Sequence, residues 1–105
     1  MKVIIEEQVR LSILEFYAIS MRLHPSLSEE TVLAKVERLI GAMHDLGKHP
    51  GIYAEARLKK SWLEAGYRET IVEDFHIAYK IEEDEDGEQY VAIYDAVHSK
   101  LYYQN

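Results

Sequence analysis

The sequence predicts one α+β domain, in which an antiparallel helix hairpin packs on one face of a twisted, mainly antiparallel sheet of four to five strands. Two observations predict this class. Apolar residues recur at helical spacing through most of the first half of the chain, whereas after residue 67 they alternate with polar residues, as in strands with one buried face. A length of 105 residues suits one core, so residues 1–105 are expected to form a single domain.

The first predicted strand covers Lys2 to Glu6, a short run rich in Val and Ile. The next segment, from Glu7 to about Leu23, carries two apolar stripes at helical spacing, so this helix is expected to be covered on more than one side. His24-Pro25 ends the helix, because the residue before a proline is pushed out of the α region. The two stripes are Val9, Ile13, Phe16 and Tyr17, and Leu11, Leu14, Ala18 and Met21.

A second helix is predicted to begin at Ser26 or Ser28 and to pair with the first in an antiparallel hairpin. Ser26 and Glu29 have the spacing of a capping box, and the apolar residues that follow form one seam at heptad-like spacing. Gly47 suits the position just after this helix, where a left-handed residue is favoured. The seam consists of Val32, Val36, Leu39, Met43 and Leu46, joined by Leu33 and Ile40.

Three further strands are predicted over Arg68–Val72, Phe75–Glu82 and Tyr90–Asp95, and the first two are joined by Glu73-Asp74. The segment Ile52–Leu63 favours neither a helix nor a strand. Strict alternation in the second of these strands predicts one packed face and one free face. The packed face would present Phe75, Ile77, Tyr79 and Ile81, and the free face His76, Ala78 and Lys80.

The net charge of −7 belongs to the C-terminal part of the chain. Residues 1–66 hold nine Lys or Arg and nine Asp or Glu, whereas residues 67–105 hold three and ten. Six of the seven residues from Glu82 to Glu88 are acidic, at the point where a hairpin must turn. The nearly neutral body therefore leaves nucleic-acid binding open, although phosphate binding usually needs a cationic surface.

The composition of the chain and the spacing of its residues also exclude several kinds of site. No apolar stretch reaches the roughly 18 residues that span a bilayer, and Glu6 interrupts the N-terminal apolar run, so a cytoplasmic protein without membrane contact is expected. The absence of cysteine excludes disulfides and thiolate chemistry. The acidic loop resembles the start of a calcium loop but has Ile93 where a bidentate Glu is needed, and the histidines lack ligand spacing. Neither a metal nor a cofactor is expected.

One local concentration of positive charge could hold phosphate. Trp62 and Tyr67 lie close to it in sequence and would add aromatic faces on which bases stack. The alternative is a solvated edge strand that its charges protect from aggregation. The cationic residues are Arg57, Lys59, Lys60 and Arg68.

The tail after the last predicted strand places His98, Lys100, Tyr102 and Tyr103 at one end of the sheet. Beside Arg68, this set would suit RNA cleavage without a metal. A base would take the proton of the 2′-hydroxyl, cations would stabilise the phosphorane, and an acid would protonate the leaving 5′-oxygen. The alternative is that the tail only docks its aromatic rings against the sheet or a partner.

The order and spacing of these motifs resemble the RelE/ParE superfamily, the toxins of type II toxin–antitoxin modules. The resemblance covers nearly the whole chain and is carried by the stretches LGKHPGI, GYRETIVEDFHIAYKI and YVAIYDAVHSKLY. It implies a RelE/ParE-like fold and a cognate antitoxin whose extended segment and helix wrap the toxin. It also implies a homodimer or a toxin–antitoxin hetero-oligomer and a role in plasmid stabilisation.

The superfamily contains two kinds of toxin. RelE-type members are mRNA interferases, which are ribosome-dependent endoribonucleases that inhibit translation, whereas ParE-type members inhibit DNA gyrase without being nucleases. Arg68 matches the family arginine of the "yR" element, and His98, Lys100 and Tyr102 match the end-of-sheet positions that RelE-type members use for catalysis. His76 stands where an arginine is usual.

The resemblance thus implies a catalytic set of His98, Arg68, Lys100, Tyr102 and His76. Arg57, Lys59 and Lys60 would hold the RNA phosphates, since Lys59 and Lys60 fall where RelE-type nucleases often have lysines. Arg68-Glu69 followed by an apolar strand is more similar to the ParE type. We therefore expect an mRNA interferase, with gyrase inhibition and a non-catalytic interaction domain as alternatives.

Overall fold

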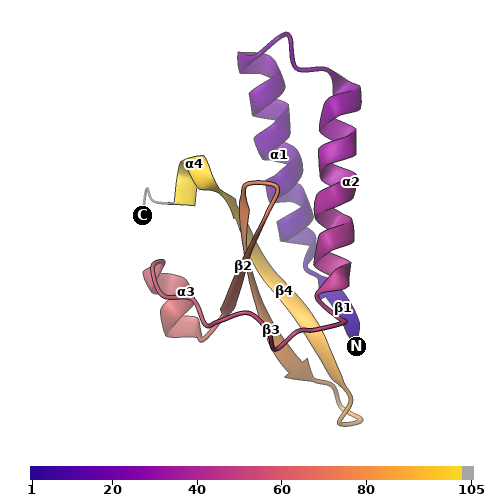
Figure 1. Cartoon of the computed structure of the whole chain (residues 1–105), viewed down its shortest axis with the longest axis vertical. Helices are drawn as coiled ribbons and strands as arrows, with labels where there is room; N and C mark the ends of the chain where they lie inside the picture. The colour runs from indigo at the N-terminus through magenta and orange to yellow at the C-terminus, as the bar shows by residue number, and fades with distance from the viewer. Residues whose placement is uncertain (103–105) are drawn as a thin grey trace.

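The structure, a computed structural model, describes residues 1–102 and confirms the α+β class (Figure 1). Helices and strands follow each other in the predicted order, with one short helix in the segment that the sequence left unassigned and another in the tail. The elements are β1 (Lys2–Ile5), α1 (Glu7–Leu23), α2 (Glu29–Asp45), α3 (Lys60–Ala65), β2 (Arg68–Val72), β3 (Phe75–Glu83), β4 (Gln89–His98) and α4 (Ser99–Tyr102).

The four strands form one sheet in the order β1-β4-β3-β2. β1 runs parallel to β4, while the pairs β4–β3 and β3–β2 are antiparallel, so the sheet is mixed but mainly antiparallel. Glu73 and Asp74, with φ of 50° and 67°, form the two-residue turn between β2 and β3. Positive φ at both residues is typical of the turns whose twist matches that of a hairpin.

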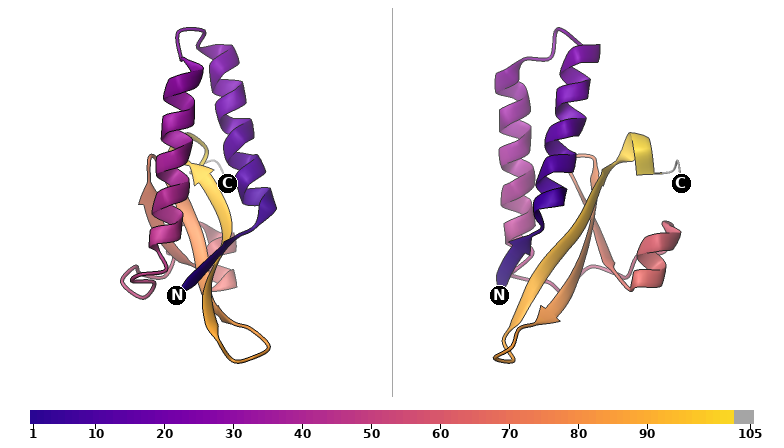
Figure 2. Two further views of the ribbon diagram at one scale, coloured as in Figure 1. Left: turned by 90° about the vertical axis from the view of Figure 1, so that its right-hand side faces the viewer. Right: turned by 180° about the vertical axis from the view of Figure 1, so that it is seen from behind.

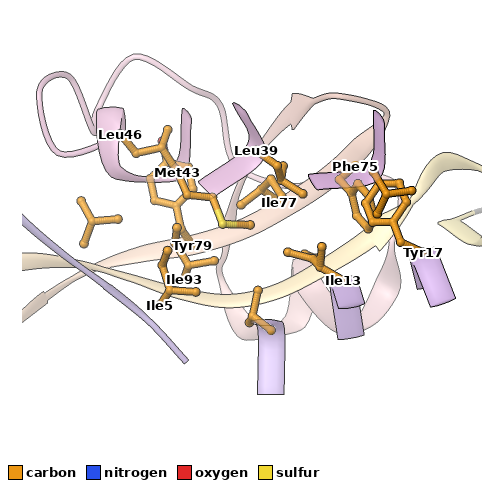
Figure 3. Packing of buried hydrophobic residues seen from close by; sticks show 14 residues of the cluster. Ile5, Ile13, Tyr17, Leu39, Met43, Leu46, Phe75, Ile77, Tyr79 and Ile93 are labelled. Carbon is orange, nitrogen blue, oxygen red and sulfur yellow. The ribbon is translucent and has the colours of Figure 1, made fainter. Parts of the chain in front are cut away.

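The main core lies between the helix hairpin and one face of this sheet (Figures 2 and 3). The predicted seam of α2 supplies Leu39 and Met43, which meet Ile77 and Tyr79 from β3 and Ile93 from β4. The start of α2 is fixed by Ser28, whose Oγ accepts a hydrogen bond from the Thr31 amide at 3.1 Å. No helix within residues 1–102 is both long and apolar enough to cross a membrane.

The opposite face of the sheet is also covered, so the prediction of a free face is wrong. α3 and α4 lie on the far side of the sheet from α1 and α2 in Figures 1 and 2. Trp62 from α3 and Tyr102 from α4 pack there with Ala56 and Ala78 in a second, smaller core. The alternating residue His76 is consequently buried, with 4% of its surface exposed.

A β-bulge in β4 changes which side chains share a face. Tyr79 pairs with Ile93 and Ala78 pairs with Asp95, so Tyr94 is the extra residue. Strict alternation from Ile93 would place His98 on the face that carries α4. Because of the bulge, His98 turns to the helix hairpin instead and stacks on Phe16, with 4.1 Å between ring centroids.

Helix α1 is covered on one side only, contrary to the sequence prediction. Its first stripe is buried against the sheet, as Val9, Ile13 and Tyr17 show. In the second stripe, Leu11 and Leu14 are 57% and 53% exposed. Within residues 1–102, Leu11 and Leu14 are thus left largely uncovered, whereas Met21 of the same stripe packs against the main core.

The prediction for Gly47 is also wrong, because its φ is not positive. Its lack of a side chain serves a close approach instead, since an added Cβ would lie 2.1 Å from the carbonyl oxygen of Met1. A left-handed glycine does end a helix at Gly66, where φ is 74° after α3.

Candidate functional site

The candidate site is built around the carboxylate of Glu69 on the sheet face opposite the helix hairpin. His76 Nδ1 lies 2.9 Å from Glu69 Oε2, and the Tyr102 hydroxyl donates a hydrogen bond to Glu69 Oε1 at 2.8 Å. These three residues come from β2, β3 and α4. The register pairs Glu69 with Ala78, so His76 is its diagonal neighbour on the same face.

Aromatic packing fixes the positions of these groups. The His76 and Tyr102 rings stack with 3.6 Å between centroids and 9° between planes. Trp62 meets Tyr102 edge-on, and its indole Nε1–H donates to Asp95 Oδ2 at 3.0 Å. The tail therefore docks its Tyr102 ring against the sheet, and its phenol reaches a carboxylate there.

An open groove of 740 Å³ runs along the edge of β2 and reaches two of the three residues. The segment before α3 forms one wall, because Ala56 N–H donates to Tyr67 O and Glu69 N–H donates to Ala54 O. The groove thus combines one cation, Arg57, with two carboxylates and two phenols, and Glu69 and Tyr102 are the pair that is hydrogen-bonded to each other. It is lined by Tyr53, Ala54, Glu55, Ala56, Arg57, Leu58, Glu69, Thr70, Ile71 and Tyr102.

The arrangement can accept a proton and donate one at neighbouring oxygens. Ionised Glu69 is an acceptor, and Tyr102 is a donor already hydrogen-bonded to it. Because an ionised carboxylate can only accept, the hydrogen bond with Glu69 places an imidazole proton on His76 Nδ1. This bond holds the carboxylate in one orientation. His76 does not line the groove, so it acts on a bound molecule through the groove residues that it contacts, Glu69 and Tyr102.

His98 lies outside this cluster, on the helix side of the sheet. Besides Phe16, its ring meets Phe75 edge-on at 5.2 Å. Its Nδ1 accepts a hydrogen bond from the Lys100 amide at 3.1 Å, which ties the strand end to α4. Burial lowers the pKa of His98 from its ordinary value, and this effect outweighs the opposing effect of Asp74.

The Arg68 side chain contacts neither the cluster around Glu69 nor His98. Its guanidinium donates to the Tyr53 carbonyl at 2.7 Å. In the sheet, Arg68 pairs with Tyr79 in the middle of β3, while His98 pairs with Phe75 at its start, so the two residues pair with β3 positions four residues apart. Of the five residues predicted as catalytic, the structure brings His76 and Tyr102 together beside Glu69, while His98 contacts Lys100 through the backbone amide of Lys100.

The predicted RNA-binding cluster divides in a similar way. Arg57 lines the groove, whereas the Lys59 ammonium lies 5.9 Å from the centroid of Trp62 and Lys60 pairs with Glu64 at 3.9 Å. The expectation that Trp62 stacks on bases is wrong, because its side chain is 1% exposed. The predicted aromatic platform is thus a core residue.

Glu69 is the site residue that the sequence patterns do not single out. A two-residue turn at Glu73-Asp74 sets the register of the hairpin, and this register places Glu69 and His76 on one face. That spacing is the signal from which the pair could have been predicted. Tyr103 of the predicted tail lies outside the described residues.

The acidic hairpin tip is closed by its own hydrogen bonds. Asp84 Oδ1 accepts from the amides of Asp86 and Glu88, each at 2.9 Å. Figure 1 places this tip at the far end of the β3–β4 hairpin from α4. Among residues 1–102, no group of three or more His, Asp or Glu side chains is arranged to hold a metal ion.

No protein-family model matches the sequence, and no curated protein matches it either. The geometry of the groove and the motif resemblance are thus the two bases on which a function can be proposed.

Proposed function

We propose that this chain is the toxin of a type II toxin–antitoxin module and that it cleaves mRNA on the ribosome without a metal ion. The observation that carries the proposal is the shared groove, in which Arg57, Glu69 and Tyr102 face one open space. A cation, a proton acceptor and a proton donor are the three groups that cleavage by a 2′-hydroxyl requires. The resemblance of the motifs to RelE-type toxins supports the same reaction.

Arg57, Glu69 and Tyr102 each have one role in the proposed reaction. Arg57 holds the scissile phosphate and offsets the charge of the phosphorane. Glu69 takes the proton of the 2′-hydroxyl, whose oxygen attacks phosphorus, and Tyr102 gives its proton to the leaving 5′-oxygen. The products are a 2′,3′-cyclic phosphate and a 5′-hydroxyl.

The hydrogen bond between Tyr102 and Glu69 restores the starting protonation state of the site after cleavage. The proton on Glu69 returns to the Tyr102 phenolate across the 2.8 Å contact between their oxygens. No net proton is gained or lost in a turnover. His76 is a positioning residue, because it keeps the Glu69 carboxylate oriented through its Nδ1–H.

A second candidate function is gyrase inhibition by a non-catalytic toxin. The apolar share of the groove favours it, because Tyr53, Leu58 and Ile71 are all exposed beside the polar groups. Apolar side chains of this kind suit a protein target. In that case Glu69, His76 and Tyr102 serve only to dock α4.

Induced expression in a bacterium separates these functions. We expect growth arrest with new mRNA 5′ ends in the wild type, and at least a ~100-fold loss of cleavage in Glu69→Gln and Tyr102→Phe, since each removes one proton-transfer group. Tyr102→Phe retains the ring that stacks on His76. Primer extension on an abundant mRNA measures the ends, and DNA damage is scored in parallel.

The matched control is Tyr94→Phe. The Tyr94 hydroxyl also donates a hydrogen bond to a carboxylate, that of Glu82, but neither residue lines the groove. This variant should cleave mRNA like the wild type. Filamentation with DNA damage and intact mRNA would instead establish gyrase inhibition. Growth without arrest would contradict both functions and leave an interaction domain.

A further inference from the structure

The outer side of α1 carries an apolar row that the rest of the domain leaves open. Leu11, Leu14 and Ala18 recur at helical spacing and are called here the outer stripe, whereas Met21, the next apolar residue at this spacing, is partly buried against the main core. Leu11 and Leu14 are more than half exposed, and Ala18 is exposed as well. In the right-hand view of Figure 2, α1 stands in front with no other element across it.

Opposite charges stand at the two ends of the outer stripe. Glu7 lies at the start of α1 and Arg22 in its last turn, and both are exposed. Within residues 1–102, neither residue makes a salt bridge. At a rise of ~1.5 Å per residue, each of them lies about 11 Å along the helix from Leu14.

We propose that the outer stripe is the interface of a two-fold symmetric dimer with a second copy of this chain. A dyad beside Leu14 would run the two α1 helices antiparallel. It would then place Glu7 of each copy near Arg22 of the other and pack Leu11 against Ala18. The stripe is self-complementary in both charge and apolar pattern.

The charge pattern favours a second copy over a membrane or RNA. Helices that lie on anionic membranes are rich in Lys and Arg, whereas the charged residues of α1 beside the stripe include Glu7 and Glu15 as well as Arg10 and Arg22. A polyanion would meet the same carboxylates. The proposal is independent of the proposed function, since the groove lies on the other side of the sheet.

Sedimentation velocity on the full chain, over a dilution series up to on the order of 100 μM, tests the dimer. We expect a monomer–dimer equilibrium that Leu14→Glu weakens more than tenfold. Glu7→Arg and Arg22→Glu should each weaken it about tenfold, because a two-fold interface doubles each like-charge contact. The double variant Glu7→Arg/Arg22→Glu restores the pairs and should dimerise like the wild type.

The control is Leu33→Glu, which places a charge at an exposed leucine of α2 outside the stripe and should leave the equilibrium unchanged. Circular dichroism of every variant checks that the fold is retained. A monomer at every concentration would overturn the proposal and assign the stripe to another protein. Equal weakening by Leu33→Glu, or a double variant no better than its parents, would also overturn it.

Discussion

At the residue scale, Glu69 is the centre of the site because one carboxylate bonds to both an imidazole and a phenol. The sequence could predict His76 and Tyr102 as chemically able residues, since their types are typical of proton transfer. The hairpin register set by the two-residue turn could also have placed Glu69 beside His76, but the contact of Glu69 with Tyr102 depends on the docking of α4, which the sequence does not show. Residue type is local information, whereas proximity depends on the whole fold.

His98 predicts a pH dependence of stability. Burial lowers the folded-state pKa of His98 below its ordinary value of 6.5, so the unfolded chain binds the proton first as pH falls. This residue therefore adds stability above that value, and the contribution is lost as pH falls through the folded-state pKa. Thermal unfolding between about pH 7.5 and about pH 5 should show a smaller loss for His98→Gln than for the wild type.

Both proteins share every other titrating group, so the difference between their pH profiles isolates His98. A Gln side chain can still accept the hydrogen bond from the Lys100 amide that His98 accepts in the structure. Parallel pH profiles for the two proteins would show that His98 has the same pKa in the folded and unfolded chains.

At the element scale, patterns of local sequence predict the elements well and their irregularities poorly. The periodicity of α2 and the alternation of β3 mark real elements, because each pattern follows from one continuous buried surface. The bulge at Tyr94 leaves no pattern in the sequence, yet it decides that His98 faces α1. The covering of the second sheet face by α3 was likewise not predicted, since a helix of six residues is too short to show a period, whereas docking of the tail's aromatic rings against the sheet was one of the two expectations for the tail.

Two glycines near the end of α2 should respond oppositely to alanine. Gly47→Ala places Cβ 2.1 Å from the backbone of Met1, and moving that backbone should cost about 1–3 kcal/mol. Gly41→Ala has nothing within 4 Å of its new Cβ and should stabilise the helix by about 0.5–1 kcal/mol. Urea unfolding midpoints of both variants measure these changes.

A Gly47→Ala protein as stable as the wild type would show that the start of β1 does not press on Gly47. The Gly41→Ala variant is the control, because both substitutions add one methyl group to the same region of the chain. It tells whether a loss of stability in Gly47→Ala comes from the close contact with Met1.

At the scale of the whole molecule, the densest run of acidic residues, Glu82 to Glu88, stands apart from the groove. The acidic tip lies away from α4, and the groove with Arg57 lies between the segment before α3 and β2. The sequence shows that the excess of acidic residues belongs to the C-terminal part of the chain and that six of them stand together from Glu82 to Glu88. It could not predict that Arg68 and His98 pair with β3 residues four positions apart, Tyr79 and Phe75, because that separation depends on the register of the sheet.

Neutralising the tip should therefore leave mRNA cleavage unchanged. Glu83→Gln, Glu85→Gln and Asp86→Asn together remove three negative charges from a chain of net charge −7. Asp84 is kept because its carboxylate closes the turn. Cleavage of ribosome-bound mRNA by the triple variant, measured at two salt concentrations, should match the wild type within about threefold, because exposed charges farther than a Debye length are screened.

A cleavage rate that changes more than tenfold in the triple variant would show that the tip takes part in binding ribosomes or RNA. Its solubility and unfolding midpoint, measured alongside, distinguish that effect from a loss of folded protein.

The ends of the cleaved mRNA test the central claim most directly, because they record the chemistry of the groove. Purified chain is incubated with programmed ribosomes, and the ends are assigned by whether they accept a ligated adaptor before and after phosphatase or kinase treatment. Attack by the 2′-hydroxyl, with Glu69 as base and Tyr102 as acid, predicts 5′-hydroxyl and 2′,3′-cyclic phosphate ends in the wild type and almost none with Glu69→Gln. Ends carrying a 5′-phosphate, or equal cleavage by Glu69→Gln, would contradict the account.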